Sequence, residues 1–247
     1  MRARAVVVAE ADGDRPCRLT ELRGAAPIGL RPTPEALYLT STAQGLVGDD
    51  QLELDVVVGV GATLVIRSVA ATLAYASAGA RLVVNATVAA GGRLDWHPEP
   101  LIVTRRCRAS IEASVAIESG GALSWTEECL LGRFEEEPGD AEISLAIDHA
   151  DTPLLRHRLA VGPAAPGFDG PAVLGRNRAV GCRVLAGALE LPHRRTGPNW
   201  AVLDLEGPGV LVSVLGSTFE ELRSNLAEAC DPGRAMAELG VVAPTVG

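Results

Sequence analysis

The chain contains no lysine and few aromatic residues. All 22 of its basic residues are arginines, and Phe, Trp and Tyr together make up 3% of the 247 residues. A core must therefore be built from Val, Leu, Ile and Ala. The arginines are scattered and the formal net charge is −9. Because nucleic-acid binders concentrate positive charge on one face, this composition argues against nucleic acid as a partner.

Long apolar runs and paired cysteines are also missing. No apolar run reaches the ~18 residues that a transmembrane helix needs. Residues 1–8 are basic and then apolar, but Glu10 and Asp12 follow at once, so we expect a β-strand there and not a signal sequence. The five cysteines form no C-x-x-C pair, which argues against a disulfide framework or a thiolate zinc site. These absences predict a cytoplasmic protein without a membrane segment.

Known catalytic motifs are absent from the sequence. It has no P-loop, no G-x-S-x-G elbow and no H-E-x-x-H helix. Gly59-Val60-Gly61 lacks the third glycine and the following helix of a dinucleotide fingerprint. The residues alone therefore reveal no known catalytic motif and no site for a permanent cofactor.

What the sequence does contain is a repeat. Residues 52–66, 82–96 and 111–125 each read as an alternating strand, a glycine-containing turn and a second alternating strand. Their closing leucines stand at positions 64, 94 and 123, so the period is 30 and then 29 residues. Units that recur in this way bury one another's apolar faces by stacking. The predicted fold class is mainly β, with stacked strand–turn–strand units in a β-solenoid-like or layered all-β arrangement.

Weaker signals extend this pattern. A fourth unit alternates at residues 143–147 and reverses over the longer stretch 148–153. A fifth unit begins at residues 182–185. No composition shift is sharp enough to divide the chain, so we expect one domain over residues 1–247.

The pattern changes once, near the C-terminus. Residues 217–229 predict a helix, because Ser217 or Thr218 can cap it and apolar residues recur at helical spacing. A second short helix is expected at about residues 234–239. The helical segment near residues 217–239 thus follows an otherwise β chain.

Polar residues that could hold a metal gather in two places. Asp148 and His149 stand in a predicted turn with His157 nearby, and carboxylates and imidazoles are metal ligands. Glu127 stands in a predicted strand, where an unpaired carboxylate is costly, and Arg133 is its expected partner. A solvated turn and a plain ion pair are the simpler interpretations of these two groups.

Several short segments occur in an order typical of one protein family. Thr42–Leu54 is similar to the pattern "GGLVGGDxLxLxV", and Gly61-Ala62 followed by Ala70–Tyr75 is similar to "GA…AATKxY". Further on, Leu94–Ile102 is similar to "LEWLPQPxI", Leu130–Arg133 to "LGR" and Pro153–Leu155 to "PLL". Together these segments resemble the urease accessory protein UreD family, called UreH in some organisms.

The resemblance implies a mostly-β scaffold that is not an enzyme. Members of the family bind the urease apoprotein subunits and join the accessory proteins UreF and UreG, of which UreG is a GTPase. The complex delivers nickel to urease, so Ni²⁺ is expected only in transit. Dimerisation within the accessory complex is compatible with this expectation. Neither nucleic acid nor a membrane is expected as a partner.

The resemblance also makes two groups of polar residues candidates for a nickel path or a partner face. Carboxylate and imidazole groups suit nickel, and a conduit requires weak, exchangeable ligands. The metal group is Asp148, His149 and His157. The partner or conduit group is Glu127, Arg133, Asp49 and Asp50.

Some positions depart from the family pattern. Leu73 stands where the family often has lysine, Ala76 where it often has arginine, and Asp49 where it has a second glycine. His157 stands where an acidic residue often follows "PLL", and the tryptophan-bearing tail is missing after Pro232. These differences indicate a divergent branch.

Two other functions are open at this point. A β-solenoid carbohydrate-active enzyme would need paired carboxylates or an acidic calcium cluster on aligned rungs. The aligned positions carry Thr63/Val65, Arg93/Asp95 and Ala122/Ser124, which form no acidic ladder. The other alternative is a structural, partner-binding protein unrelated to urease.

Overall fold

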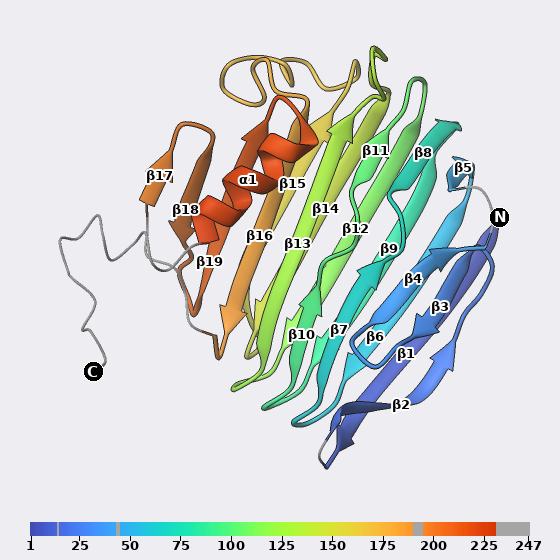
Figure 1. Ribbon diagram of the computed structural model, residues 1–247, viewed down its shortest axis with the longest axis vertical. Coiled ribbons are helices and arrows are strands. Elements are labelled where there is room, and N and C mark those ends of the chain that lie inside the picture. The colour runs from blue at the N-terminus through green and yellow to red at the C-terminus, as the bar shows by residue number, and fades with distance from the viewer. Residues whose placement is uncertain (14, 43–44, 190–194, 231–247) are drawn as a thin grey trace.

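The computed structural model describes residues 1–13, 15–42, 45–189 and 195–230 (Figure 1). Within these ranges the chain is mainly β, with two sheets that enclose a shared core and one helix near the C-terminus. The predicted fold class is confirmed. That helix is too short and too polar to cross a membrane.

Seven strands form the first sheet. In spatial order they are β15 (Thr152–Val161), β14 (Asp140–His149), β12 (Arg108–Ile117), β9 (Ala80–Val88), β6 (Gln51–Val58), β1 (Arg2–Asp12) and β2 (Arg15–Arg23). The strand expected at the N-terminus is β1, which pairs in parallel with β6.

Twelve strands form the second sheet. Its main path is β17 (Arg195–Gly197), β18 (Trp200–Asp204), β19 (Gly209–Gly216), β16 (Ala179–Gly187), β13 (Ala122–Leu131), β10 (Arg93–Trp96), β7 (Thr63–Ser68), β4 (Leu37–Ser41) and β3 (Ile28–Pro32). The remaining strands are β11 (Leu101–Val103), β8 (Thr72–Ser77) and β5 (Leu46–Gly48). β11 pairs with β13 and β8, and β8 pairs with β5.

Parallel, in-register pairing stacks the three predicted repeats. Their first strands, β6, β9 and β12, are neighbours in the first sheet, where Leu54 pairs with Val84. Their second strands, β7, β10 and β13, are neighbours in the second sheet, where Leu64, Leu94 and Leu123 align. The sequence period is therefore one coil of a β-solenoid.

Glycine allows each coil to reverse in the same way. Gly61, Gly91 and Gly120 have φ angles of +69°, +67° and +81°, a region that residues with a Cβ rarely adopt. The turns also stack, because Gly61 N–H donates to Ala90 O and Gly91 N–H donates to Gly120 O. Adjacent coils are thus joined at their turns as well as along their strands.

The core lies between the two sheets. It is aliphatic, as the composition predicts, except for Trp96 and Trp125, whose rings stack with centroids 4.6 Å apart. The two rings occupy equivalent positions of β10 and β13, which pair directly. The stack of coils thereby forms a stack of indoles inside the protein.

The expectations for a fourth and a fifth unit were wrong in part. β14 does continue the stack, but the chain reverses in two residues, Ala150 and Asp151, whose φ angles are +48° and +61°. Left-handed residues at both central positions form a tight hairpin turn, so β15 returns antiparallel to β14 in the same sheet. The predicted fifth unit at residues 182–185 is part of β16, which runs antiparallel to β13 and ends the parallel stack.

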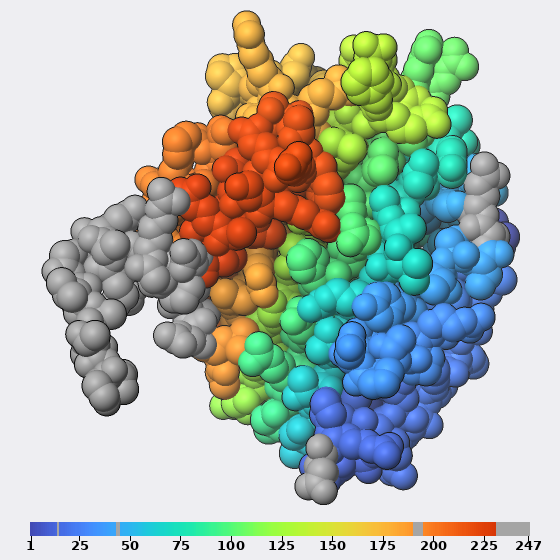
Figure 2. All heavy atoms as spheres, in the orientation of Figure 1, coloured from blue at the N-terminus to red at the C-terminus, as the bar shows by residue number. Residues whose placement is uncertain are grey.

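The helix α1 (Phe219–Cys230) covers part of the outer face of the second sheet (Figures 1 and 2). Thr218 Oγ1 accepts a hydrogen bond from Glu221 N–H, and the Glu221 carboxylate accepts one from Ser217 N–H, which confirms the predicted cap. Leu222 and Leu226 pack on β18 and β19. The second helix predicted at about residues 234–239 lies outside the described residues.

The indole stack yields a first testable prediction. Replacing the buried Trp125 with alanine should lower the free energy of unfolding by about 3–5 kcal/mol, because a large cavity is left in the core. Val60→Ala is the control, since Val60 is 71% exposed in a turn of the same stack and should change stability by no more than about 0.5 kcal/mol. If urea unfolding shows equal losses of stability for the two substitutions, the position of Trp125 in the core is contradicted.

Candidate functional site

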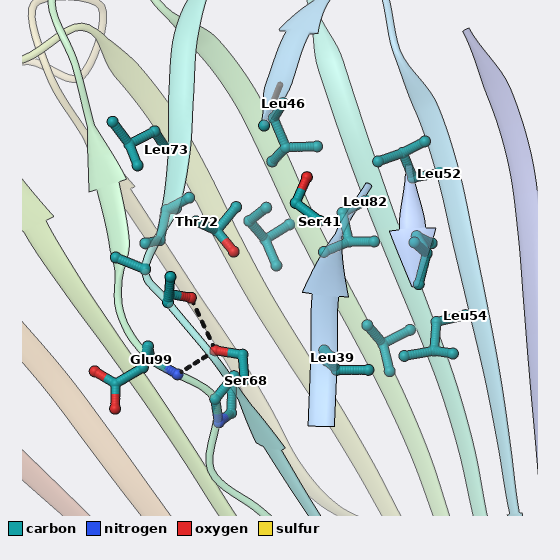
Figure 3. Close-up of a pocket in the computed structure, with 18 of the residues that line it drawn as sticks. Leu39, Ser41, Leu46, Leu52, Leu54, Ser68, Thr72, Leu73, Leu82 and Glu99 are labelled. Carbon is teal, nitrogen blue, oxygen red and sulfur yellow. Dashed lines mark hydrogen bonds between the residues drawn. The ribbon is translucent and has the colours of Figure 1, made fainter. Parts of the chain in front are cut away.

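A cavity of about 520 Å³ lies between the two sheets. Its wall is largely apolar, and Figure 3 shows part of it. The leucines labelled there come from β4, β5, β6, β8 and β9, and they are Leu39, Leu46, Leu52, Leu54, Leu73 and Leu82. Both stacked tryptophans line the cavity too. Such a space is typical of a binding pocket or an internal passage.

The second sheet is interrupted beside this cavity. β13 pairs with β10 as far as Trp125 and with β11 from Cys129 onward. Between these contacts, residues 97–100 leave the sheet, and residues 126–128 of β13 border the gap. We call this interruption the sheet opening. Both borders contribute residues to the cavity wall, so the cavity reaches the sheet opening.

Hydrogen bonds hold the loop at the sheet opening in place. His97 N–H donates to Ile66 O over 3.0 Å, and Glu99 N–H donates to Ser68 Oγ over 2.8 Å (Figure 3). The Glu99 carboxylate is directed away from the leucines of the cavity wall (Figure 3). The loop therefore presents its acidic group at the rim of the cavity.

Glu127 faces the cavity from β13. Trp125 Nε1 donates a hydrogen bond to Glu127 Oε1 over 3.0 Å, whereas Oε2 is buried with no hydrogen-bond partner among the described residues. Burial raises the pKa of Glu127 to about 7, although the Trp125 hydrogen bond lowers it in part. This carboxyl can therefore gain or lose a proton near neutral pH.

The predicted ion pair between Glu127 and Arg133 was wrong. Arg133 instead pairs with Glu136 over 2.9 Å in the turn after β13, and its guanidinium and backbone N–H donate three hydrogen bonds that lower the pKa of Glu136 to about 2. Six residues of extended chain span roughly 20 Å, so an arginine just beyond the end of the strand is out of reach of Glu127. Glu127 thus lacks the charge partner that the sequence suggested.

The neighbouring Glu128 points to the other face of the sheet, beneath α1. Arg223 Nη2 lies 3.0 Å from Glu128 Oε2 and 3.0 Å from Glu99 Oε2, and His97 Nε2 lies 3.8 Å from Glu128 Oε2. Burial alone would raise the pKa of Glu128, but His97 and Arg223 outweigh it, and the pKa lies below its ordinary value. We call these four residues the Arg223 cluster. Sequence reasoning missed it because its contacts join residues 95 and 124 positions apart.

The structure does not bring Asp148, His149 and His157 together. Asp148 forms an ion pair with Arg156, which neighbours His157 on β15 and therefore projects from the opposite face of the sheet. His157 pairs across the strands with Leu145, whereas His149 lies at the far end of the hairpin. The parts of the chain described here contain no group of three or more His, Cys, Asp or Glu residues placed to hold a metal ion.

Asp49 and Asp50 have different surroundings. The Asp50 side chain is buried and accepts hydrogen bonds from the Met1 ammonium group over 2.8 Å and from Val47 N–H over 3.3 Å. The Asp49 side chain is 92% exposed. Asp50 therefore orders the turn before β6, and Asp49 is accessible from solvent.

The buried carboxyl of Glu127 generates a pH-dependent prediction. Because its pKa is raised from 4.5 to about 7, the folded protein binds this proton more tightly than the unfolded chain does. Its contribution to stability should fall by up to about 3 kcal/mol as the pH rises from 4.5 to 7, and then stay constant. Glu127→Gln keeps the acceptor for Trp125 without titrating, so it should equal wild type at pH 4.5 and be more stable at pH 8. Thermal melting curves of both proteins at both pH values check this prediction. If the stability difference between Glu127→Gln and wild type is the same at pH 4.5 and pH 8, the raised pKa of Glu127 is contradicted.

Comparisons with known proteins identify the family. The family model described as UreD urease accessory protein matches residues 1–245. A urease accessory protein UreD of Parafrankia sp. (strain EAN1pec) is 38% identical, over 92% of this chain and 86% of its own length. The UreD of Frankia casuarinae is 36% identical over 94% and 89%, and UreD 3 of Streptomyces griseus is 37% identical over 93% and 95%. The chain therefore belongs to the UreD family of urease accessory proteins.

Proposed function

We propose that this protein is a non-catalytic scaffold of urease maturation that binds the urease apoprotein together with UreF and UreG. Its family membership supports a role in urease maturation, which implies contact with urease-related proteins. A framework of stacked coils suits this role, because it offers broad faces and a preformed interior without requiring a nucleophile. In this proposal the protein acts in the cytoplasm.

The proposal that the protein handles Ni²⁺ rests on one observation: Glu127 lies on the wall of a leucine-lined cavity. Ni²⁺ passes through this cavity as cargo. One carboxylate with a single hydrogen-bond donor offers a weak site, from which the metal can leave again. With a pKa of about 7, Glu127 can release its proton as the cation arrives and take it back afterwards. After the cation has left, the reprotonated carboxyl carries no charge in the cavity.

The other candidate residues have separate roles in this proposal. Asp49, Arg133, Asp148 and His149 lie at or near the surface and belong to partner-facing regions. His157 is half-buried, its Nδ1 has no hydrogen-bond partner among the described residues, and burial lowers its pKa. A neutral imidazole is the form that binds a metal, so His157 is proposed as a second candidate, in a half-buried position apart from the residues that line the cavity.

The carbohydrate-active alternative gains no support. The rungs do align as expected, with Arg93 opposite both Thr63 and Ala122, and Asp95 opposite Val65 and Ser124. Asp95 is the one carboxylate among these positions, and it is paired with Arg67. A glycoside hydrolase needs two carboxylates across the scissile bond.

Urease activation in a reconstituted system tests the proposal. Glu127→Ala and His157→Ala should each lower activation by about tenfold, the lower range for losing a group that supports a metal site, while the protein stays folded. Glu142→Gln is the matched control, because Glu142 lies on the outer face of the first sheet and pairs with Arg158. If urease activation is unchanged with both alanine variants, the proposed internal route for Ni²⁺ is contradicted.

A further inference from the structure

The cavity between the two sheets is too large to be a packing defect. Its volume of about 520 Å³ lies within the range of roughly 300–1,000 Å³ that is typical of small-molecule sites. Native cores are close-packed and contain few voids larger than a water molecule. Because an empty space between apolar side chains costs stability, a cavity of this size indicates an occupant.

The cavity reaches the protein surface at the connection between β7 and β8. Val69 in this connection lines the cavity and is 65% exposed, and the neighbouring Ala70 is exposed as well. On the opposite side, Ala113 of β12 and Ile143 of β14 line the cavity and are buried in the first sheet. The cavity therefore extends from the surface beside Val69 to the inner face of the first sheet.

The charged groups around the cavity all have the same sign. Its wall contains the carboxyl groups of Glu99, Glu127 and Glu128, and none of the described lining residues is an arginine or a histidine. Arg223 pairs with Glu99 and Glu128 from outside this wall. Glu127 has no charge partner among the described residues, and its hydrogen bond comes from Trp125. An ionised Glu127 therefore leaves one negative charge in the cavity that no neighbouring side chain compensates.

Glu127 has the capacity for one more polar contact. Its Oε2 atom is buried and has no hydrogen-bond partner among the described residues, although buried polar atoms are normally satisfied. The terminal torsion of a glutamate has broad minima, so a small rotation turns Oε2 toward the cavity that the residue lines. A ligand beside Glu127 therefore needs a hydrogen-bond donor, and a cationic donor forms the stronger bond with a carboxylate.

We propose that the cavity is a binding site for a small aliphatic amine. The ammonium group of the ligand donates to the Glu127 carboxylate, and its hydrocarbon chain packs against leucines such as Leu54 and Leu82 (Figure 3). This class of ligand matches both features of the wall, which are a largely apolar surface and one unpaired carboxyl. The site does not depend on the proposed function in urease maturation. A bound amine would, however, occupy the cavity that Ni²⁺ crosses in that proposal.

Ionisation of Glu127 controls the affinity for an amine. The titratable groups that face it are the thiols of Cys129, which follows on β13, and Cys182, which pairs with Glu127 from β16. Burial raises the pKa of Cys129 to about 12 and also raises that of Cys182, so both thiols stay neutral between pH 5.5 and pH 8. An aliphatic amine has a pKa of about 10.4 and stays charged over the same range. Of these groups only Glu127, with a pKa of about 7, changes its charge, and amine binding should strengthen as the pH rises.

The test measures binding of simple probes to the purified full chain by tryptophan fluorescence, because Trp96 and Trp125 line the cavity. At pH 8, n-octylamine should bind at least about tenfold more tightly than n-octanol, which has the same chain without a charge. Methylamine has the charge without the chain and should bind at least about tenfold more weakly than n-octylamine. From pH 5.5 to pH 8 the affinity for n-octylamine should rise at least about tenfold.

Glu127→Gln separates the charge from the shape of the cavity. The amide keeps the acceptor for Trp125 but carries no charge, so the affinity for n-octylamine should fall by about tenfold and lose its pH dependence. The affinity for n-octanol should stay the same. Glu142→Gln is the matched control, because Glu142 lies on the outer face of the first sheet, and this variant should bind both probes like wild type.

The outcomes distinguish the cavity from the acidic surface. A preference for n-octylamine that depends on pH and on Glu127 supports the site. Equal binding of n-octylamine and n-octanol, a preference that survives in Glu127→Gln, or no binding of either probe overturns it. Equal affinities for methylamine and n-octylamine would show adsorption to surface carboxylates and also overturn it. If n-octylamine binds as described while urease activation is insensitive to Glu127, the amine site stands and the proposed Ni²⁺ route fails.

Discussion

The parallel register of the stacked coils is the constraint on which the rest of the structure depends. A slip of one residue between β10 and β13 would turn every inward side chain outward. In the observed register Leu94 aligns with Leu123 and Trp96 with Trp125. Glu127 follows Trp125 by two residues, so it faces the same interior and receives the indole hydrogen bond. The position of the most unusual carboxyl in the core is thus a direct result of how the coils are aligned.

Strand alternation places two adjacent acidic residues in opposite environments. Glu127 faces the cavity, and burial favours its protonated form near neutral pH. Glu128 lies beneath α1, where Arg223 and His97 favour its ionised form despite burial. The interruption of the ladder at residues 97–100 makes both arrangements possible, because a continuous neighbouring strand would close the sheet there. The stacked framework therefore determines the surroundings of both carboxylates.

The sequence predicted what depends on local periodicity. The aligned leucines at 64, 94 and 123 and the cap at Ser217 and Thr218 are confirmed, because strand alternation and helix capping are set by neighbouring residues. The features that it failed to predict depend on long-range geometry. The Arg223 cluster joins distant elements. The reversal after β14 is shorter than predicted. The sequence does not reveal this, because Ala150 followed by Asp151 is not a pair that strongly favours the left-handed backbone conformation.

In the proposed function, this chain is a partner-binding scaffold of urease maturation that carries nickel. An affinity pull-down from an extract of the native cells, with partners identified by mass spectrometry and nickel measured in the eluate, tests it most directly. Urease subunits should be recovered together with UreF- and UreG-like proteins, and nickel should exceed the level of a bait-free control. A soluble, folded bait that recovers none of these proteins would contradict it.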